Sequence, residues 1–278
     1  MFELKSASLK YGETTALWPY SRTFKRGRIT VLIGANGAGK STVMSLLTSE
    51  QTPTTGAVFF QNRNLTAWKV HELAQRRAVL PQRTHLSFPF TVYEVVGLGL
   101  MASTRPPYER KRLIGEMLAR VDLADHRSRL YQQLSGGEQQ RVQLARVLCQ
   151  LEASDEPAED RYLLLDEPIT SLDIRHQIST MNIARGYAEQ GLGVIAVLHD
   201  LNLAAHYADE VIVMREGRVL ADCAPAYAFD PDIIEEAFGV RPQIIDRGNG
   251  LMPFVSVLGP GPTKTPRSQN PGSTGLVH

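Results

Sequence analysis

The most constraining feature of this chain is a glycine-rich run at residues 34–41, GANGAGKS. It follows a short β-branched segment, residues 29–33 (ITVLI), and precedes apolar residues at helical spacing, Val43, Leu46 and Leu47. The run matches the pattern G-x-x-x-x-G-K-[ST], in which glycine N–H groups close around phosphate oxygens where a helix begins. A strand before the loop and a helix after it are the context that this pattern requires. The sequence therefore predicts a phosphate-binding loop in an α/β domain.

Three later apolar runs indicate further buried strands. They are residues 162–165 (YLLL), 193–198 (GVIAVL) and 211–214 (VIVM), and helical patterns separate them. The first run ends at paired acids and the second at a histidine. Continuous apolar strands that alternate with helices are typical of a mostly parallel sheet with helices on both faces. We therefore expect an α/β fold whose ligands bind at the carboxyl ends of the strands.

The middle of the chain has a different pattern. Strand-like runs stop there, and helical patterns with charged faces take over, as in residues 109–121. We expect an α/β core formed by residues 1–84 and 160–258, with a helical subdomain inserted at about residues 85–159. Residues 259–278 are rich in Pro, Gly, Ser and Thr, a composition that cannot bury a core, so they are expected to be a disordered tail.

Composition excludes several classes of protein. The 278 residues are 43% hydrophobic, which is enough for a packed core and excludes general disorder. Thirty Lys and Arg against 29 Asp and Glu leave a net charge of +1, so no basic excess favours a nucleic-acid partner. No window approaches the roughly 20 apolar residues that a membrane span needs, so any membrane role is expected to come through a partner. Cys149 and Cys223 form no C-x-x-C pair, which favours a reducing compartment.

The paired acids after residues 162–165 indicate hydrolysis of a bound nucleotide. Lys40 is expected to reach the β- and γ-phosphates, and the Ser41 hydroxyl to hold Mg²⁺. Asp166 suits the Mg²⁺ shell, and Glu167 suits a general base that polarises the attacking water. The alternative is a strand that simply ends in solvated acids. The phosphate-loop pattern elsewhere in the chain favours the catalytic interpretation.

The segment LSGGE at residues 134–138 is consistent with two compatible roles, a helix cap and an anion-binding helix end. Ser135 and Glu138 are spaced as a capping box ahead of an amphipathic run. Two glycines in a first helical turn lower helix propensity, and they suit a helix end that approaches an anion closely. We therefore expect the cap to build a helix whose first turn binds phosphate.

Together these motifs resemble those of the ATP-binding cassette (ABC) ATPases over about residues 2–258. GANGAGKST is similar to the family's Walker A motif, LSGGE to its signature and YLLLDEP to its Walker B. The resemblance implies a P-loop (RecA-like) core with an antiparallel β edge and a helical subdomain. It also implies a head-to-tail dimer that holds two MgATP, each between the Walker A of one copy and the signature of the other. The nucleotide-binding residues that it implies are Asn36, Gly37, Gly39, Lys40, Ser41, Thr42, Ser135, Gly136, Gly137 and Glu138.

Four further residues match positions of this family. Gln82 resembles the Q-loop glutamine, Asp173 the nucleotide-contacting D-loop aspartate and His199 the switch histidine. Tyr11 stands where the family often stacks an aromatic ring on adenine, and a packing aromatic is the alternative. One departure is Ile169, which replaces a hydroxyl residue and puts a D-loop contact in doubt. The resemblance assigns catalysis to Glu167, His199 and Gln82, and Mg²⁺ binding to Ser41, Gln82 and Asp166.

Several details are similar to the haemin-import ATPases, which belong with the ferric-siderophore and cobalamin importers. They include FPFTVYEVV at residues 88–96, HDLNLAAHYAD at residues 199–209 and an unusually long acidic linker at residues 151–160. We expect the linker itself to be a solvated surface insertion. The resemblance implies a peripheral ATPase on the cytoplasmic face of the inner (plasma) membrane. Its implied partners are a second copy, a dimer of a polytopic membrane permease and, indirectly, a substrate-binding protein.

Other functions stay open at this point. No residue of this chain would touch haem, so a ferric-siderophore or cobalamin importer is an alternative. A soluble ABC ATPase of DNA repair or translation is disfavoured, because the chain has neither a long coiled-coil insertion nor a second cassette. A regulatory subunit without ATP turnover is disfavoured by Glu167 and His199.

Overall fold

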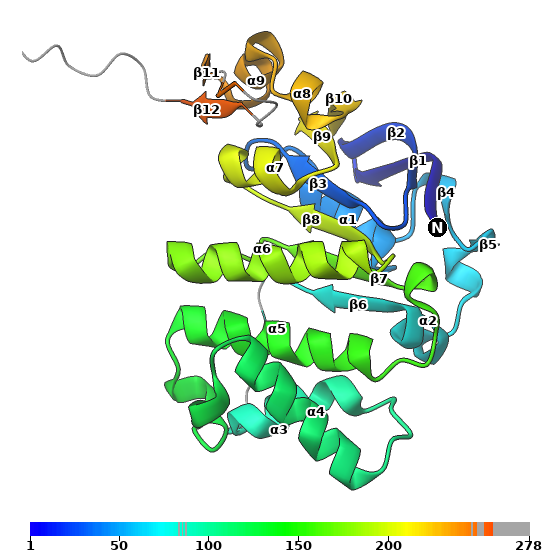
Figure 1. Ribbon diagram of the computed structural model, residues 1–278. Coiled ribbons are helices and arrows are strands. Elements are labelled where there is room, and N and C mark those ends of the chain that lie inside the picture. The colour runs from blue at the N-terminus through cyan, green and yellow to red at the C-terminus, as the bar shows by residue number, and fades with distance from the viewer. Residues whose placement is uncertain (83, 85, 87, 246, 249–252, 258–278) are drawn as a thin grey trace, which may run out of the picture.

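A six-stranded, mostly parallel sheet forms the centre of the fold (Figure 1). The computed structural model describes residues 1–82, 84, 86, 88–245, 247–248 and 253–257, so the expected tail lies outside the described residues. The strand order is β10-β9-β3-β8-β7-β6, and only β10 is antiparallel to its neighbour. Its strands are β3 (Ile29–Ile33), β6 (Arg77–Leu80), β7 (Tyr162–Asp166), β8 (Gly193–Val197), β9 (Glu210–Arg215) and β10 (Arg218–Cys223). The expected parallel sheet is confirmed.

A second, antiparallel sheet lies beside the first and confirms the expected β edge. Its order is β2-β1-β4-β5, formed by β1 (Phe2–Tyr11), β2 (Thr14–Phe24), β4 (Thr55–Phe60) and β5 (Arg63–Asn64). Helix α1 (Lys40–Leu47) packs between the two sheets, because one buried cluster contains its apolar residues together with those of both sheets. The Tyr162 hydroxyl donates to the Phe24 carbonyl at 2.8 Å and joins the sheets across this layer. The end of α1 that follows the glycine-rich run is thereby fixed from two sides.

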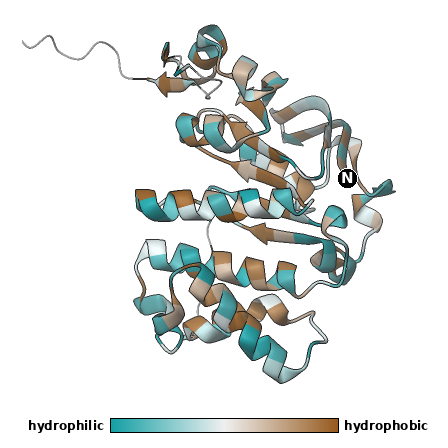
Figure 2. Cartoon of the chain, in the orientation of Figure 1, coloured by the Kyte–Doolittle hydropathy of each residue, from teal (hydrophilic) through white to brown (hydrophobic). Residues whose placement is uncertain are grey.

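Helices cover the other face of the central sheet and form the insertion. Helix α5 packs against α3, α4 and β6, and a larger buried cluster joins it to the sheet. Figure 2 shows apolar colour along the central strands and hydrophilic colour on the outer turns of the helices. Besides α1, the α-helices are α2 (Val70–Arg76), α3 (Val92–Gly97), α4 (Pro107–Arg120), α5 (Gly136–Glu152), α6 (Ile174–Glu189), α7 (Leu201–Tyr207), α8 (Pro225–Ala228) and α9 (Pro231–Phe238). A short hairpin of β11 (Gln243–Ile245) and β12 (Phe254–Ser256) completes the elements.

A helical insertion is present, as the sequence predicts. Between β6 and β7 the described residues form helices and turns without a strand, which agrees with the expected change of pattern. The boundaries at residues 84 and 160 stay predictions. None of the helices that the structure describes has the length and apolarity to cross a bilayer.

The acidic linker is more firmly held than expected. Three of its five carboxylates pair with arginines of helix α4, helix α2 and the turn before β3. The pairs are Glu152 with Arg120, Glu156 with Arg76 and Asp160 with Arg26. The linker is therefore a surface segment tied to both the core and the insertion.

Candidate nucleotide-binding and hydrolysis site

The loop between β3 and α1 has a backbone conformation that favours glycine. Gly34, Gly37 and Gly39 have φ of 151°, 78° and 100°. A Cβ on Gly34 would lie 2.3 Å from the Met214 carbonyl oxygen, and one on Gly39 would lie 2.9 Å from the Ala16 carbonyl oxygen. A Cβ on Gly37 would meet nothing within 4 Å. The first and last of these glycines therefore pack against neighbouring strands, and the middle one faces open space.

Lys40 lies at the centre of this loop and is 5% exposed. Its Nζ donates to the carbonyl oxygens of Gly34 at 2.7 Å and Ala35 at 3.0 Å. Burial lowers the pKa of Lys40, although the charges of Glu167 and Asp166 work in the opposite direction. A phosphate would interact with this ammonium more strongly than the neutral carbonyls do, because the two opposite charges attract each other where water is largely excluded.

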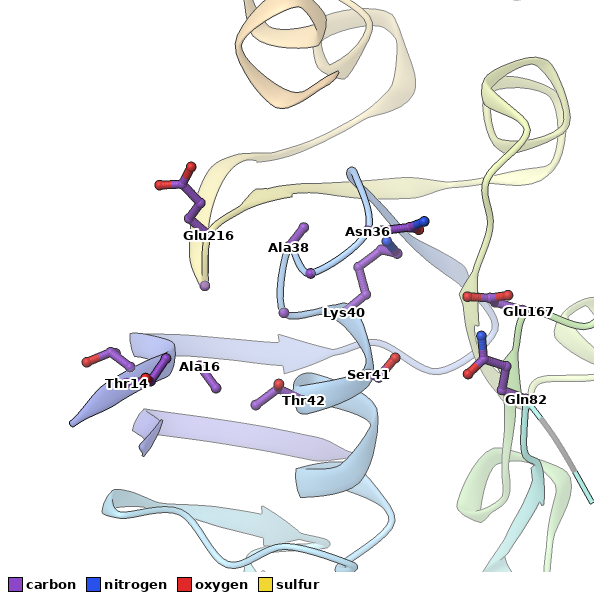
Figure 3. Close-up of a pocket in the computed structure, with 14 residues that line it drawn as sticks. Thr14, Ala16, Asn36, Ala38, Lys40, Ser41, Thr42, Gln82, Glu167 and Glu216 are labelled. Atoms are coloured by element: carbon purple, nitrogen blue, oxygen red, sulfur yellow. The ribbon is translucent and has the colours of Figure 1, made fainter. Parts of the chain in front are cut away.

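A cavity of about 590 Å³ opens over the loop (Figure 3). Figure 3 shows Gln82 and Glu167 together on one side of Lys40, and Thr14, Ala16 and Thr42 on the other. The cavity brings together eight residues that the sequence had assigned to the site: Asn36, Gly37, Gly39, Lys40, Ser41, Thr42, Gln82 and Glu167. It also contains a wall that sequence reasoning missed: Thr14, Thr15, Ala16, Glu216 and Gly217.

The missed wall forms where two distant turns meet. Gly217 has φ of 75°, its N–H donates to the Ala38 carbonyl at 3.0 Å, and its own carbonyl accepts from Trp18 at 2.9 Å. A Cβ there would lie 2.8 Å from the Ala16 carbonyl oxygen. The Glu-Gly turn after an apolar strand was visible in the sequence, but its contact with β2 depends on the folded arrangement of the two sheets.

Glu167 follows β7 and carries the most tightly bound carboxylate of the site. Its Oε1 lies 2.7 Å from Nε2 of His199, and Oε2 accepts from the Thr170 hydroxyl at 3.4 Å. Burial acts to raise the pKa of Glu167, but hydrogen bonds from His199 and Gln82 outweigh it and lower the pKa below its ordinary value. Glu167 is therefore ionised near neutral pH, as a proton acceptor must be.

Asp166, the last residue of β7, has the opposite environment. Burial, followed by the neighbouring Glu167 charge, raises the pKa of Asp166 to about 6. Its Oδ1 is buried and has no hydrogen-bond partner. Asp166 shares a smaller cavity of about 290 Å³ with Ser41 and Thr42. An unpaired buried carboxylate oxygen near a hydroxyl is what a cation would be expected to satisfy.

The donor set suits Mg²⁺ better than a transition metal. Ser41, Gln82 and Asp166 offer hydroxyl, amide and carboxylate oxygens, and Mg²⁺ prefers oxygen ligands with one or two carboxylates plus substrate phosphates. Within the described part of the chain no group of three or more His, Cys, Asp and Glu could hold a metal ion. The oxygen donors of Ser41, Gln82 and Asp166 fit an Mg²⁺ ion that is also bound by a phosphate ligand.

The segment at residues 134–138 forms the expected cap at the start of α5. The Ser135 N–H and hydroxyl both donate to Oε2 of Glu138 at 2.8 Å, and the Glu138 N–H donates back at 3.3 Å. Oε1 of Glu138 lies 3.3 Å from His126 and 3.7 Å from Arg129. A Cβ on Gly137 would lie 2.7 Å from the Ser171 carbonyl oxygen, which gives this glycine a packing role within the chain.

Several predicted residues lie away from the 590 Å³ cavity. Ser135, Gly136, Gly137, Glu138, Asp173 and Tyr11 do not line it. Tyr11 is 52% exposed and lines the smaller cavity beside Ser41, so its stacking role stays a prediction. Asp173 caps α6 by accepting from the His176 N–H at 2.9 Å. Ile169 is buried in the core, and the neighbouring Thr170 supplies the hydroxyl that reaches Glu167.

Comparison with known proteins identifies the family of the chain. A family model described as ABC transporter matches residues 17–170, which is more than half of the chain. The chain belongs to this family. An ABC ATPase binds ATP, so the chain is an ATP-binding protein.

Two relatives of this ABC ATPase carry the same name. The chain is 47% identical over 229 residues to the hemin import ATP-binding protein HmuV of Rhizobium meliloti, covering 82% of this chain and 87% of the relative. It is 50% identical over 231 residues to the protein of that name from Mesorhizobium japonicum, covering 82% and 88%. Among solved structures, a dimeric, post-hydrolysis ATP-binding cassette bound to ADP and phosphate is similar, with a TM-score of 0.70 and 27% identity over 81% of this chain and 99% of that one.

Proposed function

We propose that this chain is the ATPase subunit of a haemin importer. The observation that carries the proposal is the identity of 47% and 50%, over most of both chains, to relatives named as haemin import ATP-binding proteins. A chain can share this identity with its relatives and still lack motif residues. Here the Walker A, Walker B, signature and switch residues are all intact. The chain therefore retains the groups that ATP-driven transport needs.

The catalytic step is assigned to residues around the 590 Å³ cavity. The loop N–H groups, Asn36 and Lys40 hold the β- and γ-phosphates. Glu167, ionised and oriented by His199 and Gln82, accepts a proton as the water oxygen bonds to the γ-phosphorus. The bond from phosphorus to the β–γ bridging oxygen breaks, and ADP and inorganic phosphate leave. Mg²⁺, held by Ser41, Gln82 and Asp166, would neutralise charge on the phosphate oxygens.

The second half of each site is assigned to a second copy of the chain. The start of α5, the positive end of the helix dipole, is exposed at Ser135 and Gly136, and neither residue lines the 590 Å³ cavity of its own chain. Head-to-tail pairing would bring this helix end and Asp173 onto the γ-phosphate in the partner. The likeness to a dimeric cassette bound to ADP and phosphate supports this arrangement.

The membrane partner is proposed to be a dimer of a polytopic permease. Phe88 is 70% exposed beside the start of α3, and this is the segment where ABC importers of known type meet a membrane subunit. Docking there would hold the ATPase peripherally on the cytoplasmic face of the inner membrane. A substrate-binding protein would act on the far side, without contacting this chain.

Uptake assays in the source cell test the proposed cargo. Replacing the native residue by Glu167→Gln should abolish haemin uptake and leave ferric-siderophore and cobalamin uptake intact. Glu189→Gln, at the exposed end of α6, is the matched control and should keep haemin uptake. If siderophore or cobalamin uptake is lost instead, the chain is still a transport ATPase but its cargo is not haemin. Survival of all three would contradict an import role for this chain.

A further inference from the structure

The main chain at Glu167 adopts a conformation that needs support. Its φ is 51°, in the left-handed region that residues other than glycine rarely occupy. Such a conformation costs free energy and persists only where surrounding contacts hold it. The Glu167 carbonyl accepts from the Thr170 N–H at 3.4 Å, so its own turn supplies one donor. A second donor to this carbonyl would help to hold the main chain, and with it the direction in which the Glu167 side chain leaves the strand.

That second donor comes from the helical insertion. Nε2 of Gln140, in the second turn of α5, donates to the Glu167 carbonyl at 3.3 Å. The half-buried Gln140 also lines a cavity of about 310 Å³ that Gln82 and Glu167 share. One turn earlier, Gly137 approaches the Ser171 carbonyl so closely that a Cβ would lie 2.7 Å from it. The first two turns of α5 therefore rest directly on the segment that begins with Glu167.

We infer that Gln140 is a positioning residue that fixes the main chain of Glu167 and so aims its carboxylate into the nucleotide cavity. The inference rests on the proposed role of Glu167 as the base. Because Gln140 and Ser135 belong to the same rigid helix, any tilt of α5 is transmitted to Glu167 through one hydrogen bond. The helix end that meets the partner's nucleotide thereby also sets the base for the nucleotide of its own chain.

Gln150, on the same helix, is a control that distinguishes positioning of Glu167 from simple anchoring of α5. Nε2 of Gln150 donates to the carbonyl oxygens of Ala74 at 2.9 Å and Arg77 at 3.0 Å. Gln150 is thus also a half-buried glutamine that ties α5 to the core, ten residues or about 15 Å further along the helix. If Gln140 only anchored α5, removing either amide would have the same consequence.

The experiment compares Gln140→Leu and Gln150→Leu in the full-length chain assembled with its permease, using steady-state ATP hydrolysis. Gln140→Leu should lower kcat about three- to tenfold, the effect of one lost hydrogen bond, with KM for ATP within about twofold of wild type. Gln150→Leu should leave both constants within about twofold. Gln140→Asn, which keeps the amide but shortens its reach, should behave like Gln140→Leu.

Two results would overturn the inference. One is wild-type kcat in both Gln140 variants, and the other is an equal fall in kcat for Gln140→Leu and Gln150→Leu. Measurements of ATP affinity and of the thermal unfolding midpoint show whether Gln140→Leu is misfolded. If it is, kcat of Gln140→Asn decides whether Gln140 positions Glu167. Glu167→Gln, measured alongside, separates this inference from the proposed function. If Glu167→Gln keeps wild-type ATP turnover, Glu167 is not the base and the proposed function is contradicted. If Glu167→Gln loses turnover while the Gln140 variants keep it, only the positioning role of Gln140 is contradicted.

Discussion

The phosphate loop and the start of α5 differ in how complete they are within one chain. The loop is buried, its lysine is enclosed, and Gly34 and Gly39 fit against neighbouring backbone with no room for a Cβ. The start of α5 is exposed at Ser135 and Gly136, and Glu138 contacts its own cap residue, His126 and Arg129 without lining the 590 Å³ cavity. We therefore propose that one region is a finished binding site and that the other is a surface that meets a second copy of the chain. Variants in the two regions should therefore fail in different ways.

The largest effect is expected from Lys40→Ala. Removing the buried ammonium should weaken ATP binding by about a hundredfold, because the phosphates lose a charge-assisted bond in a poorly solvated loop. Titration of the purified chain with ATP measures this directly. Lys111→Ala, an exposed lysine of α4, is the control and should bind as wild type does. Equal affinities in the two variants would mean that the loop is not the phosphate site.

Two glycines of the loop test whether close backbone packing holds the finished region. Gly39→Ala should destabilise the chain by about 2–3 kcal/mol, because its φ of 100° and the nearby Ala16 carbonyl oxygen both oppose a Cβ. Gly37→Ala has the unfavourable φ without the clash and should cost about 1 kcal/mol. Urea unfolding of both variants tests this difference. A similar loss in both would show that close packing does not hold the loop.

Ser135→Ala tests the unfinished region. It removes the cap of α5, which should cost about 1 kcal/mol, and it should leave ATP affinity of the single chain unchanged. ATP turnover should fall about tenfold, because the helix start no longer presents its N–H groups correctly. Thr91→Ala is a matched control, since Thr91 and Glu94 form the same kind of cap on α3. Thr91→Ala should cost similar stability but keep the turnover of the purified chain.

The smallest effect concerns Asp166 and pH. The pKa of its carboxyl is about 6 in the folded chain and lower when unfolded, so the folded state holds the extra proton between about pH 4 and 6. Stability is therefore lost as pH rises through that window. Asp166→Asn should stabilise the nucleotide-free chain by on the order of 1 kcal/mol at pH 7.5, after allowing for partial exposure, and hardly at all at pH 4. Denaturant unfolding at both pH values measures the difference. Equal effects at the two values would contradict the assignment.

The two regions also differ in what their sequence reveals. The loop, the strands before it and after it, and the Ser135–Glu138 cap are local patterns, and each appears in the structure where it was expected. The wall at Thr14 and Gly217 was not predictable, because about 200 residues separate its two turns and only the packed sheets bring them together. The contact of Gln140 with Glu167 likewise depends on how the insertion docks on the core.

The central claim is that the finished region of one copy and the exposed helix start of another form a single site. Sedimentation of the purified full-length Glu167→Gln chain, with and without MgATP, tests it most directly. The variant should bind ATP but lack the base, so a dimer should appear with ATP and disappear when Lys40→Ala is added. A Glu167→Gln chain that binds ATP and stays monomeric, and that shows no ATP-dependent closure in the assembled transporter, would contradict the shared site.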